Sequence, residues 1–170
     1  MKEYTSNEIK KTKSRWLDVG CGDGRILIPL ATQFPLKFFG IDVNDKMIDS
    51  LRNSIRHNKI NNVIARCHSG EHSLNQQRRF NVISFFQSIH FFKYEDVLKK
   101  ACEGLTNNGC IVISATTHNQ FRSIPYSKSS AIYTVEIKRT PNWINIVKNL
   151  RCRGLKLKSS KTFSITRKFK

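Results

Sequence analysis

Three glycines at every second position, with an aspartate shortly before them, form the stretch of this sequence best suited to hold a small ligand. Gly20, Gly22 and Gly24 follow residues 16–19, which are apolar except for Asp18. Glycine permits turn conformations that a Cβ forbids and lets the backbone press against a ligand. The helix expected next would present free N–H groups at its start. Asp18 could hold an ammonium group there, directly or through water.

A second carboxylate follows about twenty residues later. Asp42 lies at the end of the apolar run 38–43, where it could accept both hydroxyls of a ribose. A dinucleotide-binding turn has the pattern GxGxxG, which, counted from Gly20, requires glycine at the position of Arg25. The spacing therefore excludes a pyrophosphate site of that kind and favours a ligand with an amino-acid tail and no phosphate.

Apolar strand-like runs alternate with helical stretches along the chain. The runs are nearly continuous in apolar residues, as in parallel strands covered on both faces; they span 16–20, 38–43, 63–67, 80–86 and 110–117. Helices are expected over 26–34, 45–58, 94–105 and 140–154, with Asn44 or Asp45 as a cap and Gly154 as a stop. This alternation predicts a doubly wound α/β sheet with right-handed crossovers.

Turn residues mark two further features of the predicted fold. Residues 107–109 supply a turn before the fifth run. Residues 155–169 are interpreted as two strands joined near Ser159 and Ser160, which would form an antiparallel pair at the end of the sheet.

Length and composition predict a single domain spanning residues 1–170, with 1–15 as a polar lead. No apolar run approaches the roughly 20 residues of a membrane-spanning helix, and the lead lacks the apolar part of a secretory signal. We therefore expect a cytoplasmic protein without a membrane partner. The cysteines have no CxxC pair or nearby histidine at ligand spacing, so we expect reduced thiols and no metal site; they are Cys21, Cys67, Cys102, Cys110 and Cys152.

The chain is strongly basic, and the excess lies toward its C-terminal end. Thirty Lys and Arg face 12 Asp and Glu, for a net charge of +18. Residues 118–170 hold 13 of the cations and one acid, Glu136. Such a balance fits a polyanion partner, an anionic substrate or a solubilising surface, and the sequence leaves the three open.

Four motifs resemble those of the class I S-adenosylmethionine-dependent methyltransferases. LDVGCGDGR resembles their first motif, GIDVNDKMI their second, FNVISFFQSIHFF their fourth, and LTNNGCIVIS the segment written L-x-P-G-G. The resemblance covers residues 15–117. It implies a Rossmann-like seven-stranded sheet, mostly parallel with an antiparallel C-terminal strand, and S-adenosylmethionine as cofactor. Two departures are Asn81 in place of an acid and the loss of a proline and a glycine at 107–109.

The resemblance also implies which residues bind the cofactor. Asp18 and the glycines would surround the methionine moiety, Asp42 would bind the ribose, and Val43 and Met47 would flank the adenine. Ser69 stands where the family often has an acid near the adenine amino group, with Glu71 as the alternative. Cys21 is interpreted as packing within the turn and not as a nucleophile. The whole predicted set is Asp18, Gly20, Cys21, Gly22, Gly24, Asp42, Val43, Met47, Ser69, Gly70, Glu71 and Gln87.

The stretch QSIHFF should lie beside the reactive methyl group. His90 is a candidate base or substrate-orienting group, because a weakly acidic acceptor must lose a proton; the alternative is a structural histidine bonded to backbone. Phe91 is a candidate pocket wall. The segment 118–140 is a candidate cover for the site. Within it, Arg122, Tyr126 and Lys128 are candidates to contact the acceptor, including an anionic group on it.

Three functions remain open from the sequence. The first is methyl transfer to a small-molecule acceptor, by a monomer or homodimer. The second is an RNA or other nucleic-acid methyltransferase that uses the basic C-terminal third. The absence of a [DNS]-P-P-[YFW] stretch argues against methylation of a base amino group. The basic residues alternate along the expected strands, which argues against a single basic patch on one face. The third is a cofactor-binding partner subunit without catalysis, suggested by Asn81 and the altered turn at 107–109.

Overall fold

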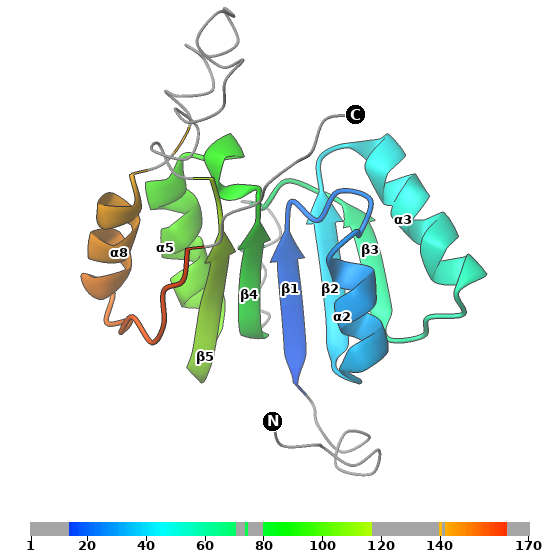
Figure 1. The fold of residues 1–170 in the computed structure, drawn as a ribbon, viewed down its shortest axis with the longest axis horizontal. Helices are drawn as coiled ribbons and strands as arrows, with labels where there is room; N and C mark the ends of the chain where they lie inside the picture. The colour runs from blue at the N-terminus through cyan, green and yellow to red at the C-terminus, as the bar shows by residue number, and fades with distance from the viewer. Residues whose placement is uncertain (1–13, 71–73, 75–79, 117–139, 141, 163–170) are drawn as a thin grey trace, which may run out of the picture.

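The computed structural model describes residues 14–70, 74, 80–116, 140 and 142–162, and these form an α/β fold around one parallel sheet (Figure 1). The sheet order is β3-β2-β1-β4-β5, and every pair of neighbouring strands is parallel. The strands are β1 (Arg15–Val19), β2 (Lys37–Asp42), β3 (Val63–Cys67), β4 (Phe80–Phe86) and β5 (Leu105–Ser114). The predicted doubly wound architecture is confirmed.

The helices lie between the strands in the sequence and beside the sheet in space. They are α2 (Leu27–Gln33), α3 (Asp45–His57), α5 (Tyr94–Gly104) and α8 (Trp143–Arg151), with a short 3₁₀ helix η1 (Ile89–Phe91) after β4. In Figure 1, α2 and α3 lie beside the β1-β2-β3 half, and α5 and α8 lie at the β4-β5 end. The chain builds outward from β1 in one direction and then from β4 in the other. The carboxyl ends of β1 and β4 are therefore the switch point at which such sheets bind ligands.

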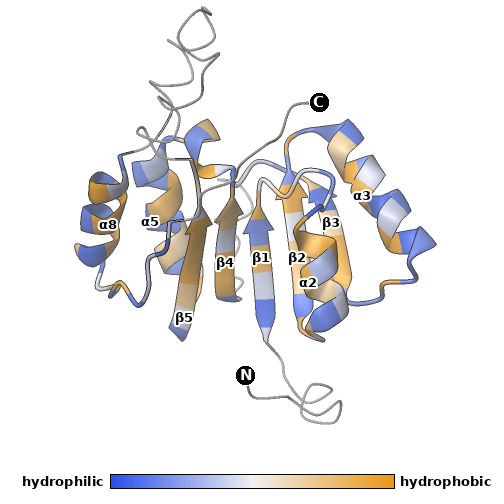
Figure 2. Cartoon of the chain, in the orientation of Figure 1, coloured by the Kyte–Doolittle hydropathy of each residue, from blue (hydrophilic) through white to orange (hydrophobic). Residues whose placement is uncertain are grey.

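Each face of the sheet has its own apolar cluster. Leu17 and Val19 of β1 pack on one face with Ile83 and Phe85 of β4 and with residues of α5 and α8. Phe38 of β2 packs on the other face with α2 and α3, through Leu27, Ala31, Ile48 and Leu51. Figure 2 shows β4 and most of β5 as hydrophobic, β1 as mixed, and the helices as mixed in character. Burial on both faces explains why the strand sequences are nearly continuous in apolar residues.

Local signals place the helix ends close to where the sequence predicts them. The Asn44 side chain caps α3 by accepting a hydrogen bond from the Met47 N–H at 3.3 Å. Asn142 caps α8 in the same way, through the Ile144 N–H at 2.9 Å. Gly154 has a φ of +83° just beyond α8, the left-handed conformation in which helices commonly end.

Two predictions at the end of the sheet need correction. Residues 155–162 contain no strand, so the first of the two predicted C-terminal strands is wrong; the second lies largely outside the described residues. The described sheet therefore has five parallel strands, and the predicted seven strands with an antiparallel end are not confirmed. Strand β5 begins at Leu105, which pairs with Phe80, and the predicted turn at 107–109 is instead a register shift inside β5.

Candidate functional site

The glycine turn joins β1 to α2 through three residues in the left-handed region. Gly20, Gly22 and Gly24 have φ values of +73°, +55° and +82°. A Cβ on Gly20 would lie 2.5 Å from Ser88 Cβ, and one on Gly24 would collide with the Leu51 side chain. A Cβ on Gly22 would meet nothing within 4 Å. Gly20 and Gly24 are thus fixed by packing against the protein, whereas Gly22 exposes its backbone to open space.

Asp42 holds this turn in place from the neighbouring strand. Its Oδ2 accepts a hydrogen bond from the Gly22 N–H at 2.9 Å, and its Oδ1 accepts one from the Asn44 N–H, also at 2.9 Å. The Gly20 and Cys21 N–H groups both donate to the Ile41 carbonyl. A carboxylate has about four lone-pair sites, so the donors of the described residues leave two acceptor positions on Asp42.

Asp18 is a buried carboxylate at the end of β1, with only 1% of its surface exposed. Its Oδ1 accepts a hydrogen bond of 2.7 Å from the Ser84 hydroxyl. Burial raises the pKa of Asp18 to about 7, the Ser84 hydrogen bond opposes this rise, and the charge of Asp42 adds to it. A cationic group placed nearby would offset the cost of burying this charge.

Cys21 lies in the turn but is not arranged as a nucleophile. It packs in the cluster beneath α2 and α3, and a Cβ on Gly40 would approach its Sγ to 2.9 Å. Burial, followed by the charges of Asp18 and Asp42, raises the pKa of its thiol. A thiol held in its neutral form is a poor nucleophile, which agrees with the packing role expected for this residue.

The stretch after β4 lies against the glycine turn. Ser88 is buried, donates a hydrogen bond to the Val19 carbonyl, and occupies the space that a side chain at Gly20 would need. Gln87 has a φ of +53°, an unusual conformation for a residue with a side chain. Its N–H donates to the Ser114 carbonyl at 2.7 Å, its Nε2 donates to Ser114 Oγ, and its Oε1 accepts from Thr116 Oγ1. Hydrogen bonds to residues at the end of β5 thus stabilise the unusual backbone conformation of Gln87.

Apolar side chains are exposed along the same carboxyl edge. Val43, directly after β2, is 70% exposed, and Met47 in the first turn of α3 is 43% exposed. Phe91 in η1 is 67% exposed, and its ring lies 4.0 Å from that of His90, which is partly buried. These are the residues that the sequence assigned to an adenine site and to a pocket wall, and they lie just beyond the carboxyl ends of β2 and β4.

The structure does not describe every predicted site residue. Ser69 is exposed just beyond β3, and the backbone of Gly70 packs against Val19 and Phe92. Glu71, Arg122, Tyr126 and Lys128 lie outside the described residues, as does nearly all of the predicted covering segment. The described residues contain no cluster of three metal-ligating side chains and no helix long and apolar enough to cross a membrane.

The sequence did not predict the role of two side chains near Asp18, and it gave too much weight to the change at a third position, Asn81. Ser84 and Trp16 form hydrogen bonds that lead to Asp18, but neither belongs to a spacing that predicts this, because their contact depends on strand register. Asn81 was considered a loss of an acid. Its Oδ1 accepts a hydrogen bond from the Arg15 N–H at 2.9 Å, so the amide pairs β4 with the start of β1 at the opposite edge from the glycine turn.

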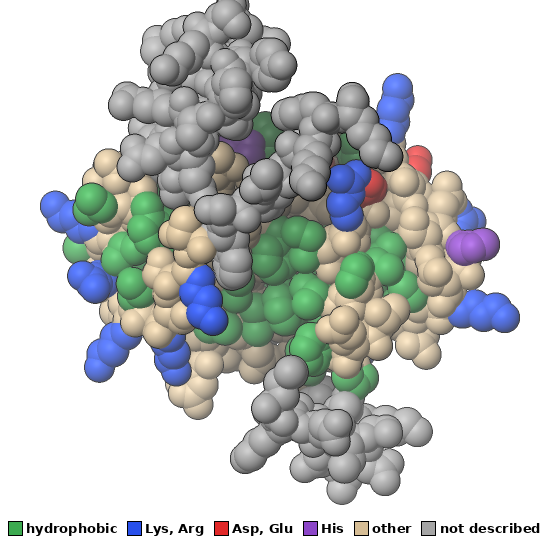
Figure 3. Space-filling model, viewed as in Figure 1, with side chains coloured by type: hydrophobic (Ala, Val, Ile, Leu, Met, Phe, Trp, Pro, Cys, Tyr) green, Lys and Arg blue, Asp and Glu red, His purple; other side chains and the backbone are tan. Residues whose placement is uncertain are grey.

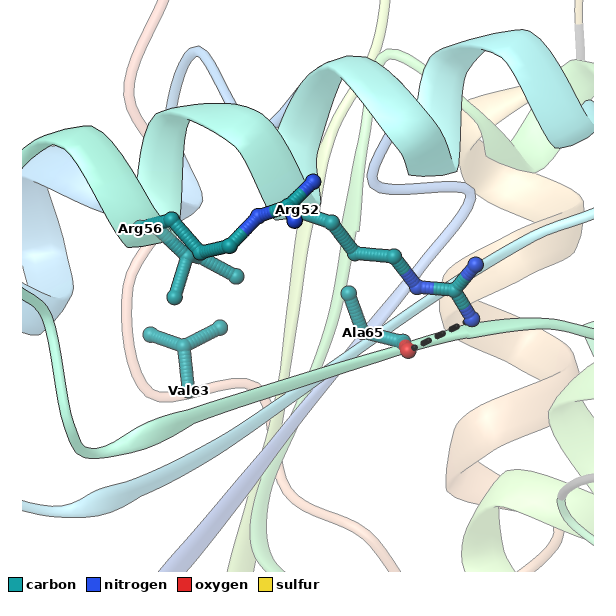
Figure 4. A pocket seen from close by; sticks show the side chains of 5 residues that line it. Arg52, Arg56, Val63 and Ala65 are labelled. Carbon is teal, nitrogen blue, oxygen red and sulfur yellow. Dashed lines mark hydrogen bonds between the residues drawn. The ribbon is translucent and has the colours of Figure 1, made fainter.

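A cavity of about 370 Å³ lies elsewhere, between α3 and β3 (Figure 4). It is lined by Arg52, Ile55, Arg56, Val63 and Ala65, and Arg52 donates to the Ala65 carbonyl at 3.4 Å. None of these residues belongs to the glycine turn or to the stretch after β4. The cavity is therefore separate from the candidate site.

Comparison with known proteins agrees with this geometry. Residues 10–152 match a family described as a methyltransferase domain. The chain belongs to this methyltransferase family. The match confirms the resemblance to class I S-adenosylmethionine-dependent methyltransferases. No curated protein matches the chain.

Solved structures show the same fold as this methyltransferase domain at low sequence identity. The plantazolicin methyltransferase BpumL in complex with SAH is 21% identical, with a TM-score of 0.64 over 85% of this chain and 55% of BpumL. A methyltransferase from Clostridium acetobutylicum is 20% identical, with a TM-score of 0.55 over 69% of this chain and 49% of its own. The [4+2]-cyclase SpnF is also 20% identical, with a TM-score of 0.55 over 58% and 38%. The chain thus spans about half or less of the length of these proteins.

Proposed function

We propose that this chain binds S-adenosylmethionine at the carboxyl edge of β1 and β2 and transfers its methyl group to a small-molecule acceptor. The observation that carries the proposal is the union of a buried carboxylate, Asp18, with a left-handed glycine turn that Asp42 holds in place. The family match over residues 10–152 supports the same activity.

The residues of the edge suit the three parts of this cofactor. Asp18 would face the ammonium of the methionine moiety, whose charge offsets the cost of burying the carboxylate. Gly22 would allow the backbone to approach, since nothing lies within 4 Å of its missing Cβ. Asp42 keeps acceptor positions for ribose hydroxyls, and Val43 and Met47 offer exposed apolar surface to an adenine.

The stretch after β4 would serve the acceptor. The cofactor supplies a methyl group already activated on a sulfonium, so the protein has to align the acceptor, exclude water and, for a hydroxyl, accept a proton. Phe91 would form one wall and exclude water. His90 would orient the acceptor or accept its proton, and Gln87 would fix the direction of this stretch through its bonds to β5. We place Arg122, Tyr126 and Lys128 opposite an anionic group of the acceptor.

A nucleic-acid acceptor is the second candidate, and one observation favours it. The cations of α8 and the segment after it are all exposed, and no acid accompanies them between residues 142 and 162; they are Lys148, Arg151, Arg153, Lys156, Lys158 and Lys161. Figure 3 shows Lys and Arg side chains at the margin of the molecule where α8 lies. Because residues 155–162 are not a strand, the argument that these cations alternate between two faces no longer applies.

A non-catalytic partner subunit is less well supported. The replacement of an acid by Asn81 has a structural explanation in its hydrogen bond to the Arg15 N–H, away from the site. The altered turn at 107–109 lies in the register shift of β5, also remote from the glycine turn. Neither change removes a group from the proposed site.

A transfer assay separates the three functions. The protein is incubated with S-adenosylmethionine carrying a labelled methyl group and with a cell extract divided into small molecules, RNA and protein. We expect label in the small-molecule fraction, and its loss in Asp42→Ala. Label in the RNA fraction that disappears at high salt would instead support the second candidate. Cofactor binding without transfer to any fraction would support the third.

A further inference from the structure

Three residues on one face of two neighbouring strands form a chain of hydrogen bonds that ends at the candidate site. Trp16 and Asp18 are two residues apart in β1, so they lie on the same face of the sheet. Ser84 of β4 is the register partner of Asp18. Trp16 Nε1 donates to Ser84 Oγ at 2.8 Å, and Ser84 Oγ donates to Asp18 Oδ1 at 2.7 Å.

The direction of this chain is fixed by chemistry. The indole N–H of Trp16 can only donate, so Ser84 must accept from it. The hydroxyl proton of Ser84 is then directed to one of two acceptors, Asp18 Oδ1 at 2.7 Å or the Leu17 carbonyl at 3.4 Å. The shorter contact to a carboxylate is the stronger. Asp18 Oδ1 is therefore held as an acceptor, which favours the ionised carboxylate.

We propose that Trp16 and Ser84 are positioning residues that hold Asp18 in its ionised form, oriented for the ammonium group of the bound cofactor. The proposal rests on the proposed function and adds to it two residues outside the glycine motif. Ser84 is fully buried and Trp16 is partly buried, where it stacks on Phe38 with ring centroids 5.4 Å apart. Their geometry is thus fixed by the core and not by a ligand.

The surroundings of Asp18 explain why it needs this support. Burial raises its pKa to about 7, and Asp42 of β2 adds to the rise; Cys21 in the turn is the other titratable group coupled to it, and it is held as a neutral thiol. Among these groups the Ser84 hydroxyl acts in the opposite direction. Without it, the pKa of Asp18 would rise further, and less of the carboxyl group would be ionised at neutral pH to pair with an ammonium.

The first test needs no cofactor. The titration of Asp18 is followed by carbon NMR of labelled aspartate side chains, with Asp18→Asn used to assign its signal. Ser84→Ala should raise the midpoint of Asp18 by about one pH unit. Trp16→Phe keeps the ring but removes the donor that polarises the Ser84 hydroxyl, and it should raise the midpoint by about half as much. Ser50→Ala on α3 and Trp143→Phe on α8 are matched controls and should leave the midpoint unchanged.

The second test measures binding of S-adenosylhomocysteine across the same pH range. Relative to the wild type, the affinity of Ser84→Ala should fall about fivefold at neutral pH, and the ratio of the two affinities should return toward one at alkaline pH, where Asp18 is ionised in both proteins. A loss equal at every pH would reveal a purely structural effect and overturn the proposal. So would an unchanged Asp18 midpoint in Ser84→Ala or in Trp16→Phe. If the wild type failed to bind while the NMR shifts appeared, the hydrogen-bond chain would hold and the cofactor assignment would fail.

Discussion

The turns after β1 and after β4 lie in contact at the switch point, and both leave their strand through a residue with positive φ. After β1 this residue is Gly20, at +73°; after β4 it is Gln87, at +53°. Ser88 joins the two, because it fills the space beside Gly20 and bonds to the Val19 carbonyl. Two neighbouring turns thus adopt the same left-handed backbone conformation, one with a glycine and the other with a residue that has a side chain.

The two turns differ in what stabilises them. The first uses glycine, which adopts the left-handed region without strain, and it is held by backbone donors to Ile41 and Asp42. The second places a side chain in that region, at a cost offset by bonds to Ser114 and Thr116 at the end of β5. The first turn therefore relies on glycine and on bonds to β2, about twenty residues later in the chain. The second turn has no glycine and depends on the end of β5, almost thirty residues later.

The largest expected effect is a side chain at Gly20. Gly20→Ala combines left-handed strain with a contact of 2.5 Å to Ser88 Cβ, so we expect it to lower the free energy of unfolding by about 3 kcal/mol. Gly22→Ala is the matched control, because it brings the strain without the collision and should cost about 1–2 kcal/mol. Urea denaturation measures both. Equal losses would show that the two turns are not packed against each other.

The next effect concerns the buried carboxylate. Burial raises the pKa of Asp18 from its ordinary value of 3.8 to about 7. Between these pH values the folded state therefore binds more protons than the unfolded chain, and the protein loses stability as pH rises through them. Above pH 7 the protein bears the full cost of burying the ionised Asp18 carboxylate. Asp18→Asn should therefore stabilise the unliganded protein by about 1–3 kcal/mol at pH 8, little at pH 4, and abolish cofactor binding.

Thermal unfolding at both pH values measures this change. The contradicting result would be an Asp18→Asn protein that is less stable than the wild type at pH 8, because the buried charge would then be favourable before any ligand is bound.

A smaller effect is expected in the second turn. Gln87→Ala keeps the strained backbone and loses two side-chain hydrogen bonds, so it should cost about 1–2 kcal/mol. Gln87→Gly loses the same bonds but removes the strain, and its stability should lie about 1 kcal/mol above that of the alanine variant. Denaturant titration of the pair measures the difference. If glycine were no better than alanine, the contrast between the two turns would be wrong.

The smallest effect on stability is expected at the exposed rim. Phe91 is 67% exposed, so Phe91→Ala should change the free energy of unfolding by less than about 0.5 kcal/mol. Once the acceptor is known, the same variant should raise its Michaelis constant and leave the affinity for S-adenosylhomocysteine unchanged. A matching loss of cofactor affinity would place Phe91 on the cofactor side of the site instead.

Local patterns predicted those parts of the molecule that depend on local physics. The strands at 63–67 and 80–86 have the predicted bounds, and Asn44 and Gly154 mark helix ends as expected, because caps and buried strands are encoded nearby in the chain. The C-terminal prediction failed for a different reason. Residues 155–158 alternate apolar and basic side chains as a strand can, but a strand also needs a partner, and the pattern does not supply one.

The candidate site shows the same division. The glycine turn and Asp42 could be predicted because the spacing between them in the sequence is typical of a turn and a neighbouring strand end that form one site. The contributions of Ser84 and Trp16 could not, and neither could the bonds from Gln87 to the end of β5, because each depends on which residues of another strand lie opposite. Only the register of β1 with β4 turns Ser84 from an unremarkable strand serine into the hydrogen-bond partner of Asp18.

The most direct test of the account is a calorimetric titration of the protein with S-adenosylmethionine and S-adenosylhomocysteine, with NAD as the control ligand. We predict binding of the first two at about micromolar concentration, no binding of NAD, and a loss of about 1–3 kcal/mol in Asp42→Ala. Binding of NAD, or of none of the three, would contradict the assignment of the glycine turn.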